Sequence, residues 1–360
     1  MKPVYLTYGS LVSPLGIGME QHLAAFNAGR TGVSFQQESG FNKEDYYLGK
    51  IESLSDDRYT DLLSLGFSHF IEEVGQELID SPSTLIIVST TKANLNDLDT
   101  DTFASTRKFI RETTNNPNTP IFISNACISG VIAVNTAADY IRSEKFTDVI
   151  VIGIDALYDF VVYGFQALYA LSNEPSKPFD KDRKGISIGE ACGIIHVTAN
   201  KPTSFHVEYL GGASSNDANH ISGPSRTGEG LVRAVTRSIE RSSISKESID
   251  FISAHGTGTV YNDEMESIAF SRLGIHHVPT NSLKGYFGHT LGAAGVIEIL
   301  ISMLSSETNT LFKSLGFDEQ GTSEALNIIT NNAQVEIKTV LKTASGFGGG
   351  NAALIFQKTL

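Results

Sequence analysis

The sequence has only two cysteines, Cys127 and Cys192, among 360 residues. Two thiols are too few for a disulfide framework or a cysteine-based zinc site. Basic residues are also scarce, because 27 Lys and Arg stand against 40 Asp and Glu, which gives a net charge of −13. Without a run of Lys and Arg to neutralise phosphates, the composition disfavours a general nucleic-acid-binding function. An acidic partner would need a local basic patch.

The start of the chain lacks a long apolar run as well. The opening "MKPVYLTYGSLVSPLG" has one lysine, and Thr7, Gly9 and Ser10 interrupt its apolar residues. We therefore expect neither a signal peptide nor a membrane span, and we expect a cytoplasmic location. Apolar residues make up 41% and charged residues 19%, which is typical of a compact, soluble, enzyme-like protein.

Short β-branched runs alternate with helical patterns along the chain. Val131, Val134, Ala138 and Ile141 share one helical face. The alternation predicts α/β layers with a buried sheet, and the length predicts two domains or two layered halves. Each half has a strand, a polar turn of small residues and a helix, so we expect halves at residues 1–200 and 201–360. The expected strands lie at 84–90, 120–124, 148–155, 192–197, 249–254 and 338–347.

Cys127 lies in "FISNACISG", between an apolar run and a turn of small residues. A strand that leads directly into a helix would place this thiol at the sheet's carboxyl edge. The helix N-terminus would lower the pKa of the thiol, which favours a nucleophile. Inert packing in the core is the alternative, because free cysteines are among the most buried residues.

Two histidines lie in glycine-rich turns. His255 ends an apolar strand in "SAHGTGTVYNDEMES", and His289 follows Lys284 in "NSLKGYFGHTLGAAG". A histidine held in such a turn can donate Nε2–H to a developing oxyanion or move protons. The alternatives are a histidine that caps a turn and, for Lys284 and His289, ordinary surface positions.

Two further glycine motifs have competing interpretations. "SGFGGGNAALIF" (345–356) fails the dinucleotide pattern because Asn351 replaces its last glycine and a strand follows. Its backbone N–H groups could instead stabilise an oxyanion. "GISIG" (185–189) matches the nucleophile elbow of hydrolases at Ser187, but it lacks the strand before it and the helix after it that an elbow requires.

Together these motifs resemble the β-ketoacyl-ACP synthases of the thiolase-like superfamily, in particular the elongating condensing enzymes with a Cys-His-His site. The resemblance covers nearly the whole chain and implies an α/β fold with thiolase-like αβαβα layers in two similar halves. The motifs occur in family order: "LTYGSLVSPLG", "NACISG", "KPFDKDRKGISIGEACG", "SSNDANHISGP", "HGTGT", "LKGYFGHTLGAAG" and "GFGGGN".

The resemblance assigns roles to individual residues. Cys127 would carry the acyl group as a thioester, while His255 and His289 would polarise the malonyl thioester carbonyl as CO2 leaves. Backbone N–H groups of Cys127 and Phe347 would stabilise the tetrahedral oxyanion. The family's supporting charged pair would be Lys284 with Glu266, and that pair would fix His289. Thr257 and Thr259 of the "HGTGT" motif complete the supporting residues. "GISIG" becomes part of a family loop, so Ser187 need not be a nucleophile.

Residue types separate this chain from related subclasses. A thiolase-like enzyme would have a second cysteine where Phe347 stands, and a chain-initiating synthase would have Asn instead of His289. Departures from the family pattern are Ile128, the pair Ser124-Asn125, and Ser345, all expected near the acyl pocket. The segment between Thr90 and Cys127 is also short, so chain-length preference is not inherited.

The expected partners are acyl-ACP and malonyl-ACP, and the expected assembly is a homodimer or a heterodimer with a related synthase. No metal or redox cofactor is implied, because the ACP carries the phosphopantetheine. Arg107, Lys108 and Arg111 are candidates for a basic ACP-docking patch, with a solvated helix face as the alternative. Fatty-acid, polyene and polyketide synthesis remain open, as does a low-activity partner subunit of a heterodimeric ketosynthase.

Overall fold

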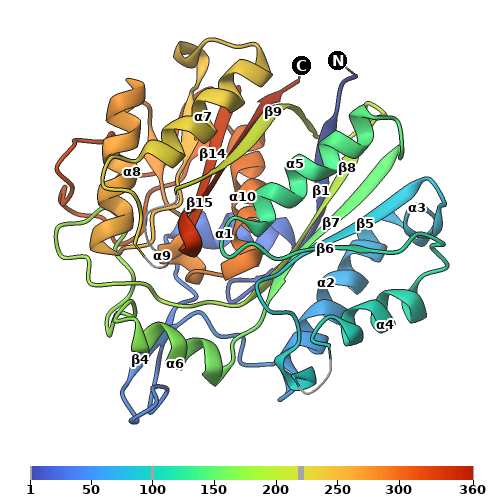
Figure 1. The fold of residues 1–360 in the computed structure, drawn as a ribbon, viewed down its shortest axis with the longest axis horizontal. Coiled ribbons are helices and arrows are strands. Elements are labelled where there is room, and N and C mark those ends of the chain that lie inside the picture. The colour runs from blue at the N-terminus through green and yellow to red at the C-terminus, as the bar shows by residue number, and fades with distance from the viewer. Residues whose placement is uncertain (1, 99–100, 218–222, 360) are drawn as a thin grey trace.

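The computed structural model of the protein describes residues 2–98, 101–217 and 223–359 (Figure 1). Residues 218–222 of the "SSNDANHISGP" motif lie outside the described residues. Most strands join one sheet in the order β11-β10-β14-β15-β9-β1-β8-β7-β5-β6, with β2 paired to β1. These strands are β1 (Tyr5–Ser13), β2 (Gly16–Ile17), β5 (Thr84–Ser89), β6 (Ile121–Ile123), β7 (Asp148–Asp155), β8 (Ala191–Thr198), β9 (Val207–Asn216), β10 (Phe251–Ser253), β11 (Thr280–Asn281), β14 (Thr339–Gly346) and β15 (Gly350–Lys358).

The two halves of this sheet have the same strand order. Numbered by their place in the chain, the five strands of each half run third, second, fourth, fifth, first. The halves join where β1 pairs with β9 at Tyr5↔Glu208 and Leu6↔Val207. The boundary expected at residue 200 falls between β8 and β9, and it stays a prediction about domain organisation. Two small ribbons lie apart from the main sheet, β3 (Ser34–Gln36) with β4 (Tyr46–Leu48) and β12 (Thr310–Leu311) with β13 (Ala333–Gln334).

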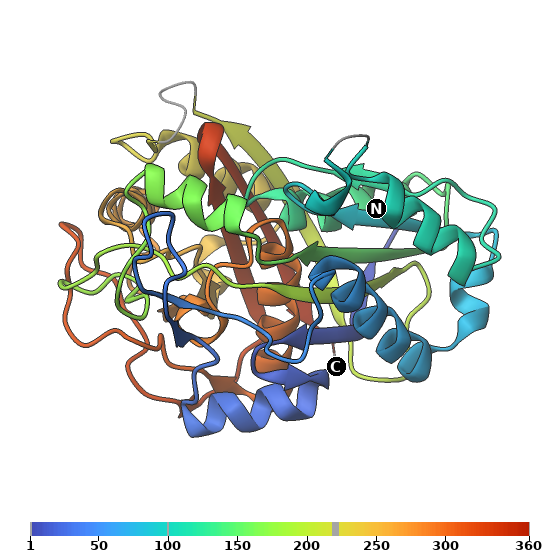
Figure 2. The same cartoon turned by 90° about the horizontal axis from the view of Figure 1, so that it is seen from below.

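Helices complete the layers. On the outer side of the first half-sheet α2 contacts β1 and β8, and on the outer side of the second α7 contacts β9 and β15. Between the half-sheets, α5 contacts both β7 and β9, and α10 contacts both β8 and β14 (Figures 1 and 2). The expected αβαβα fold is therefore confirmed. The helices are α1 (Gly18–Ala28), α2 (Arg58–Val74), α3 (Gln76–Asp80), α4 (Ala104–Thr113), α5 (Ser129–Arg142), α6 (Asp159–Ala167), α7 (Glu229–Ser242), α8 (Val260–Leu273), α9 (Lys284–Phe287) and α10 (Ala294–Thr308).

The two central helices meet at a pair of glycines. A Cβ on Gly130 of α5 would lie 2.7 Å from the backbone nitrogen of Val296, and one on Gly295 of α10 would lie 2.6 Å from that of Val131. Only residues without a side chain allow the two backbones this close. The contact brings the start of α5, just after Cys127, against the start of α10, just after His289.

The helix α10 is apolar along most of its length. The stretch Leu291–Thr308 consists of α10 and the short 3-10 turn before it. Among the described residues, it is the stretch long and apolar enough to cross a membrane, and 89% of it is buried inside the protein. The surrounding layers therefore cover the surface that lipid would otherwise contact. The helix forms the core between the two half-sheets.

Cys192 packs in the outer layer of the first half. It is fully buried on β8, where burial raises the pKa of its thiol to about 12. On α2, a Cβ at Gly66 would lie 2.5 Å from the Cys192 sulfur. Cys192 is therefore a packing residue held against a glycine.

We expect the substitution Gly66→Ala to destabilise the fold. Overpacking a core costs about 1–3 kcal/mol, while Ala in place of Gly in a helix gains about 1 kcal/mol. We therefore expect a net loss of about 1 kcal/mol in the free energy of unfolding, measured with urea. Adding Cys192→Ala should restore stability by removing the clashing sulfur, and Ser64→Ala on the exposed face of α2 is the control. Unchanged stability in Gly66→Ala would contradict the close packing.

Candidate active site

A strained turn presents Cys127. β6 ends at Ile123 and α5 begins at Ser129, as the sequence predicts. Ala126 adopts the left-handed conformation with φ 46°, which is rare outside glycine. The Ser129 hydroxyl donates to the Ala126 carbonyl at 2.6 Å and accepts the N–H of Asn125 at 2.8 Å. These bonds close the turn and direct the thiol into a cavity.

The environment of the thiol differs from our expectation. Burial raises the pKa of Cys127 to about 12, and Lys284 and the backbone of Phe347 lower it only in part. Asp155 and Glu298 raise it further. The expected lowering at the helix N-terminus is therefore wrong, because desolvation of the thiolate exceeds it. At neutral pH the cysteine is a thiol that requires a hydrogen-bond partner to react.

His289 is that partner. Its Nε2 lies 3.0 Å from the sulfur of Cys127. The ring of His255 lies next to that of His289, with centroids 5.1 Å apart and planes at 81°. The two rings reach the cavity from different elements, His255 from the end of β10 and His289 from the loop after α9. The structure thus brings together three residues that are up to 162 positions apart in the sequence.

Both imidazoles are held as Nε2–H donors. The Nδ1 of His289 accepts the Leu291 N–H at 3.3 Å, and the Nδ1 of His255 lies 3.4 Å from the Lys284 ammonium. Burial, then Lys284, lowers the pKa of both histidines well below the usual value, so both rings are neutral. A neutral ring whose Nδ1 accepts a hydrogen bond has its proton on Nε2. Both Nε2–H groups can therefore donate into the cavity.

The same tautomers bear on metal binding. Ligand atoms of Cys127, His255 and His289 all lie within 4.8 Å of one another, close enough to surround one ion. A metal ligand must offer a lone pair, but here each Nε2 carries the proton, because a donor faces each Nδ1. These tautomers favour hydrogen-bond donation by the two rings over metal ligation.

Lys284 has a different partner from the one we expected. Its Nζ lies 2.6 Å from Glu298 Oε1 and also donates to the His255 carbonyl. Glu266 instead accepts the N–H groups of His255 at 2.8 Å and Gly256 at 2.6 Å. The expected ion pair of Lys284 with Glu266 is therefore wrong, because Lys284 pairs with Glu298. Lys284 contacts His255 rather than His289. Burial, then Asp263, raises the pKa of Glu266 to about 7.

The sequence did offer one signal for Glu298. It is an acidic residue in the otherwise apolar helix α10, and a buried carboxylate requires a cation. Sequence reasoning could not say which lysine would supply it.

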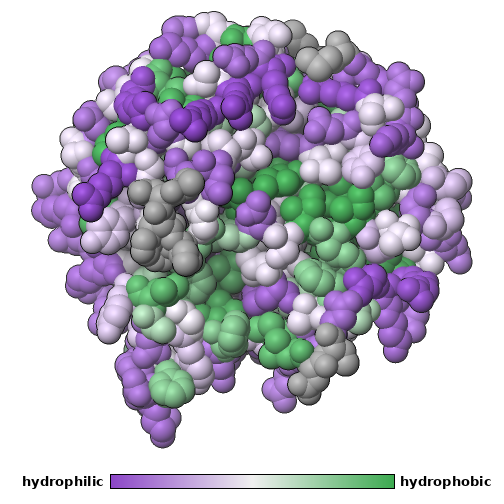
Figure 3. Space-filling view, viewed as in Figure 1, coloured by the Kyte–Doolittle hydropathy of each residue, from purple (hydrophilic) through white to green (hydrophobic). Residues whose placement is uncertain are grey.

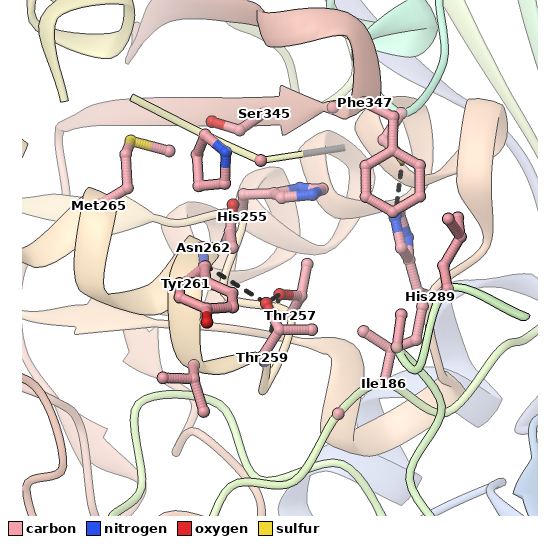
Figure 4. Close-up of a pocket in the computed structure, with 18 of the residues that line it drawn as sticks. Ile186, His255, Thr257, Thr259, Tyr261, Asn262, Met265, His289, Ser345 and Phe347 are labelled. Atoms are coloured by element: carbon pink, nitrogen blue, oxygen red, sulfur yellow. Dashed lines mark hydrogen bonds between the residues drawn. The ribbon is translucent and has the colours of Figure 1, made fainter. Parts of the chain in front are cut away.

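The three residues open into a cavity of about 460 Å³ (Figure 4). Met265 lies at one end of the view, and His289 and Phe347 lie at the other. The Phe347 ring stacks on Phe165 with centroids 5.5 Å apart. The hydroxyls of Thr257 and Thr259 lie 2.9 Å apart on the wall. Apolar parts of the lining come from Phe165, Leu168, Ile186, Val260, Met265 and Phe347.

The residues that depart from the family pattern divide into two groups. Ser345 lines the cavity, as expected. Ile128 does not, because its side chain is buried in the core beside Gly350. Ser124 and Asn125 are exposed and also lie outside the lining. Ile128 and Asn125 therefore lie near the cavity, beside its lining residue Gly350, but Ile128, Ser124 and Asn125 do not line it.

Ser187 serves the backbone around His289. Its hydroxyl accepts the Ser176 N–H at 3.1 Å, and its carbonyl accepts the His289 N–H at 2.7 Å. The residue is buried and does not line the cavity. The "GISIG" loop therefore positions His289, which agrees with our preference against a hydrolase elbow.

Family comparisons agree with this geometry. Residues 119–201 match the N-terminal domain of β-ketoacyl synthase, and residues 206–318 match its C-terminal domain. The chain belongs to the β-ketoacyl synthase family. Together the two matched segments cover more than half of the chain and include Cys127, His255 and His289.

Curated relatives match about two thirds of the chain. The 3-oxoacyl-[acyl-carrier-protein] synthase 2 of Rhizobium meliloti is 32% identical over 268 residues, covering 69% of this chain and 62% of that protein. A tetracenomycin polyketide synthase ketoacyl synthase alpha subunit from Streptomyces glaucescens is 30% identical over 66% of this chain and 59% of its own length. The match thus spans about three fifths of these relatives.

Solved structures match over the full length. A ketosynthase in complex with its chain length factor from Xenorhabdus doucetiae gives a TM-score of 0.87 at 25% identity, covering 99% of this chain and 98% of that chain. The ishigamide ketosynthase/chain length factor gives 0.88 at 25% identity with complete coverage of both. The fold is that of a ketosynthase.

Proposed function

We propose that the protein is a β-ketoacyl-ACP synthase that joins an acyl group on Cys127 to malonyl-ACP with loss of CO2. The observation that carries this proposal is the 3.0 Å contact from His289 Nε2 to the Cys127 sulfur, with the His255 ring directly beside it. A nucleophile and two oxyanion donors in one buried cavity are what acyl transfer followed by decarboxylation requires.

The first step is acyl transfer. The Cys127 sulfur attacks the thioester carbonyl of acyl-ACP, an S–C bond forms, and the bond to the ACP sulfur breaks. The thiol proton leaves with the ACP thiol. His289 Nε2–H stabilises negative charge on the attacking sulfur, which offsets the pKa increase caused by burial. A Cβ at Gly346 would lie 3.1 Å from the Cys127 nitrogen, so the glycine allows the Phe347 segment to approach the oxyanion position.

The second step is condensation. Malonyl-ACP loses CO2, and the electron pair of the broken C–C bond forms an enolate on the thioester. Nε2–H groups of His255 and His289 hydrogen-bond the enolate oxygen in a site that excludes much of the water. The enolate carbon then attacks the acyl carbonyl on Cys127. The bond between that carbonyl carbon and the sulfur breaks, and the Cys127 thiolate takes up a proton from water.

The substrates would enter on the phosphopantetheine arm of an acyl-carrier protein, so the chain needs no cofactor of its own. Thr257 and Thr259 present hydroxyls that can hydrogen-bond the amides of this arm. On α4, Arg107 is paired with Asp101, and Lys108 lies 3.9 Å from Glu112. These pairs support a solvated face rather than an ACP patch. We place the reaction in the cytoplasm.

We also propose that β6 is the assembly face. This strand is the edge of the main sheet, and its three residues are only half-buried. Figure 3 shows an apolar area in the part of the surface where Figure 1 draws β6. Unpaired apolar edges invite a second strand. A second copy or a related synthase could pair there, and ketosynthase–chain length factor complexes are among the structural neighbours.

The intact site favours an active enzyme over a low-activity partner subunit. We expect the purified chain alone, given acyl-ACPs of varied length and then malonyl-ACP, to release 3-ketoacyl-ACP detected by intact mass. Acylation without condensation, restored only by adding a related synthase, would instead support the partner-subunit role. Absence of both reactions for every acyl donor would contradict the proposed function.

A further inference from the structure

A second buried lysine lies behind the catalytic histidines. Lys342 is fully buried on β14, where it pairs with Ser253 of β10 across the sheet. Its ammonium donates to the carbonyls of Ser253 and Ala254, both at 3.2 Å. These two residues directly precede His255. Lys342 thus holds the end of the strand that carries one catalytic ring, although it does not line the cavity itself.

One carboxylate joins Lys342 to the site. Glu298 Oε2 lies 2.5 Å from Lys342, while its Oε1 lies 2.6 Å from Lys284. Lys284 in turn lies against the His255 Nδ1 and carbonyl. We call this arrangement, Lys342 with Glu298 and Lys284, the lysine clamp. It connects three elements, β14, α10 and α9, to the turn of His255.

The clamp has more positive than negative charge. With both lysines protonated, two ammonium groups share one carboxylate, so the set has a formal excess of one positive charge. Burial lowers the pKa of Lys342 below its usual value, and the Glu298 carboxylate opposes this shift. Glu266 lies nearby, and burial raises its pKa to about 7, so below that pH Glu266 is mostly protonated and cancels little of the excess. Burial also raises the pKa of Asp263. Asp155, the remaining acid near Cys127, is paired with Lys92 at 2.9 Å. The buried excess charge therefore acts on the two imidazoles.

We propose that Lys342 is a positioning residue for the condensation: it fixes the backbone before His255 and, beside burial and Lys284, adds positive charge that helps to keep both histidines neutral. This inference rests on the proposed function. Protonated rings beside an additional buried cation are unfavourable, since like charges in a low-dielectric site repel strongly. The same excess charge stabilises the negative charge that develops on the enolate.

Two variants test whether the positive charge of Lys342 makes the two histidines harder to protonate. Lys342→Met leaves Lys284 and Glu298 as a neutral pair, so the excess charge disappears and the histidines are easier to protonate. The double variant Lys342→Met/Glu298→Gln leaves Lys284 alone and restores one positive charge. A structural role alone would leave the double variant no better than the single one. The matched control is Lys338→Met, which removes an exposed lysine that precedes the same strand.

Two measurements test the role of Lys342 separately from the proposed function of the protein. The first follows the 13C-labelled ring signals of His255 and His289 by NMR from pH 9 to pH 4.5, assigned with His→Gln variants, and requires no activity. We expect at least the His255 ring to titrate at a higher pH in Lys342→Met than in wild type and Lys338→Met, and we expect the double variant to resemble wild type. The second is the pH profile of malonyl-ACP decarboxylation, whose acid limb should move to higher pH only in Lys342→Met.

Unchanged ring titration in Lys342→Met would overturn the proposal, and so would a double variant that titrates like the single one. If wild type shows no decarboxylation while the rings behave as expected, the proposed function fails and the role of Lys342 in the site stands. Thermal unfolding checks that each variant folds. Should Lys342→Met not fold, Lys342→Gln, whose amide can still donate to the Ser253 carbonyl, gives the same comparison.

Discussion

Replacing Cys127 with alanine is expected to remove the acyl adduct completely, while Cys192→Ala keeps it. Both thiols are buried and both have a pKa raised to about 12, so acidity does not distinguish them. What distinguishes them is contact, because Cys127 faces a cavity and lies 3.0 Å from His289, whereas Cys192 packs against Gly66. Intact-mass analysis after incubation with acyl-ACP measures the adduct.

The matched pair of cysteine variants also serves as the control. Peptide mapping of the wild-type adduct should place the acyl group on the peptide that contains Cys127. An adduct retained by Cys127→Ala, on Cys192 or on Ser187, would contradict the assigned nucleophile. Normal thermal unfolding of both variants would show that a lost adduct reflects lost chemistry.

The three residues of the candidate site could be predicted from the sequence because each lies in a short motif with its own local geometry. Cys127 follows a strand and precedes a helix, and His255 comes two residues after a strand, so local pattern alone places both at the carboxyl edge of a sheet. The layers were also predictable, since β-branched runs and helical faces alternate along the chain. The site assignments nevertheless rest on motif order and remain predictions until the variants are tested.

The ion pairs that Glu298 forms with Lys284 and Lys342 could not be predicted from the sequence, because they depend on packing between elements that are distant in the chain. Glu298 on α10 and Lys342 on β14 are 44 positions apart, and their contact exists only because α10 packs against β14. The raised pKa of Cys127 has the same origin, because desolvation depends on the whole surrounding fold. The left-handed backbone conformation of Ala126 could not be predicted either, because residue type predicts that conformation only for glycine and a few polar residues.

Ile128 and Ser345 both depart from the family pattern, but only Ser345 lines the cavity. Ile128 is the residue before α5, and its side chain points into the core, where Gly350 leaves room for it. Ser345 lies on β14 facing the cavity, where its hydroxyl donates to Asn351. Proximity to the nucleophile in sequence therefore did not indicate which residue shapes the cavity.

His255→Ala and His289→Ala are expected to slow different steps of the reaction. Removing one oxyanion donor typically lowers a rate by about 10²–10³-fold, so both His255→Ala and His289→Ala should reduce malonyl-ACP decarboxylation by about that factor. Only His289 touches the Cys127 sulfur, so only His289→Ala should also slow acyl transfer. Single-turnover acylation by acyl-ACP and CO2 release from malonyl-ACP measure the two steps separately.

His196→Ala is the control, since this histidine is half-buried, pairs with Asp148 and does not line the cavity. Its loss should leave both steps unchanged once folding is confirmed. Equal loss of acylation in His255→Ala and His289→Ala would contradict the division of roles, because it would mean that the His255 ring also acts on the sulfur. Unimpaired decarboxylation in both variants would show that the enolate is stabilised elsewhere. The expected difference between the two variants follows from geometry. The His289 ring contacts the Cys127 sulfur, whereas the His255 ring lines the cavity in which malonyl-ACP would react.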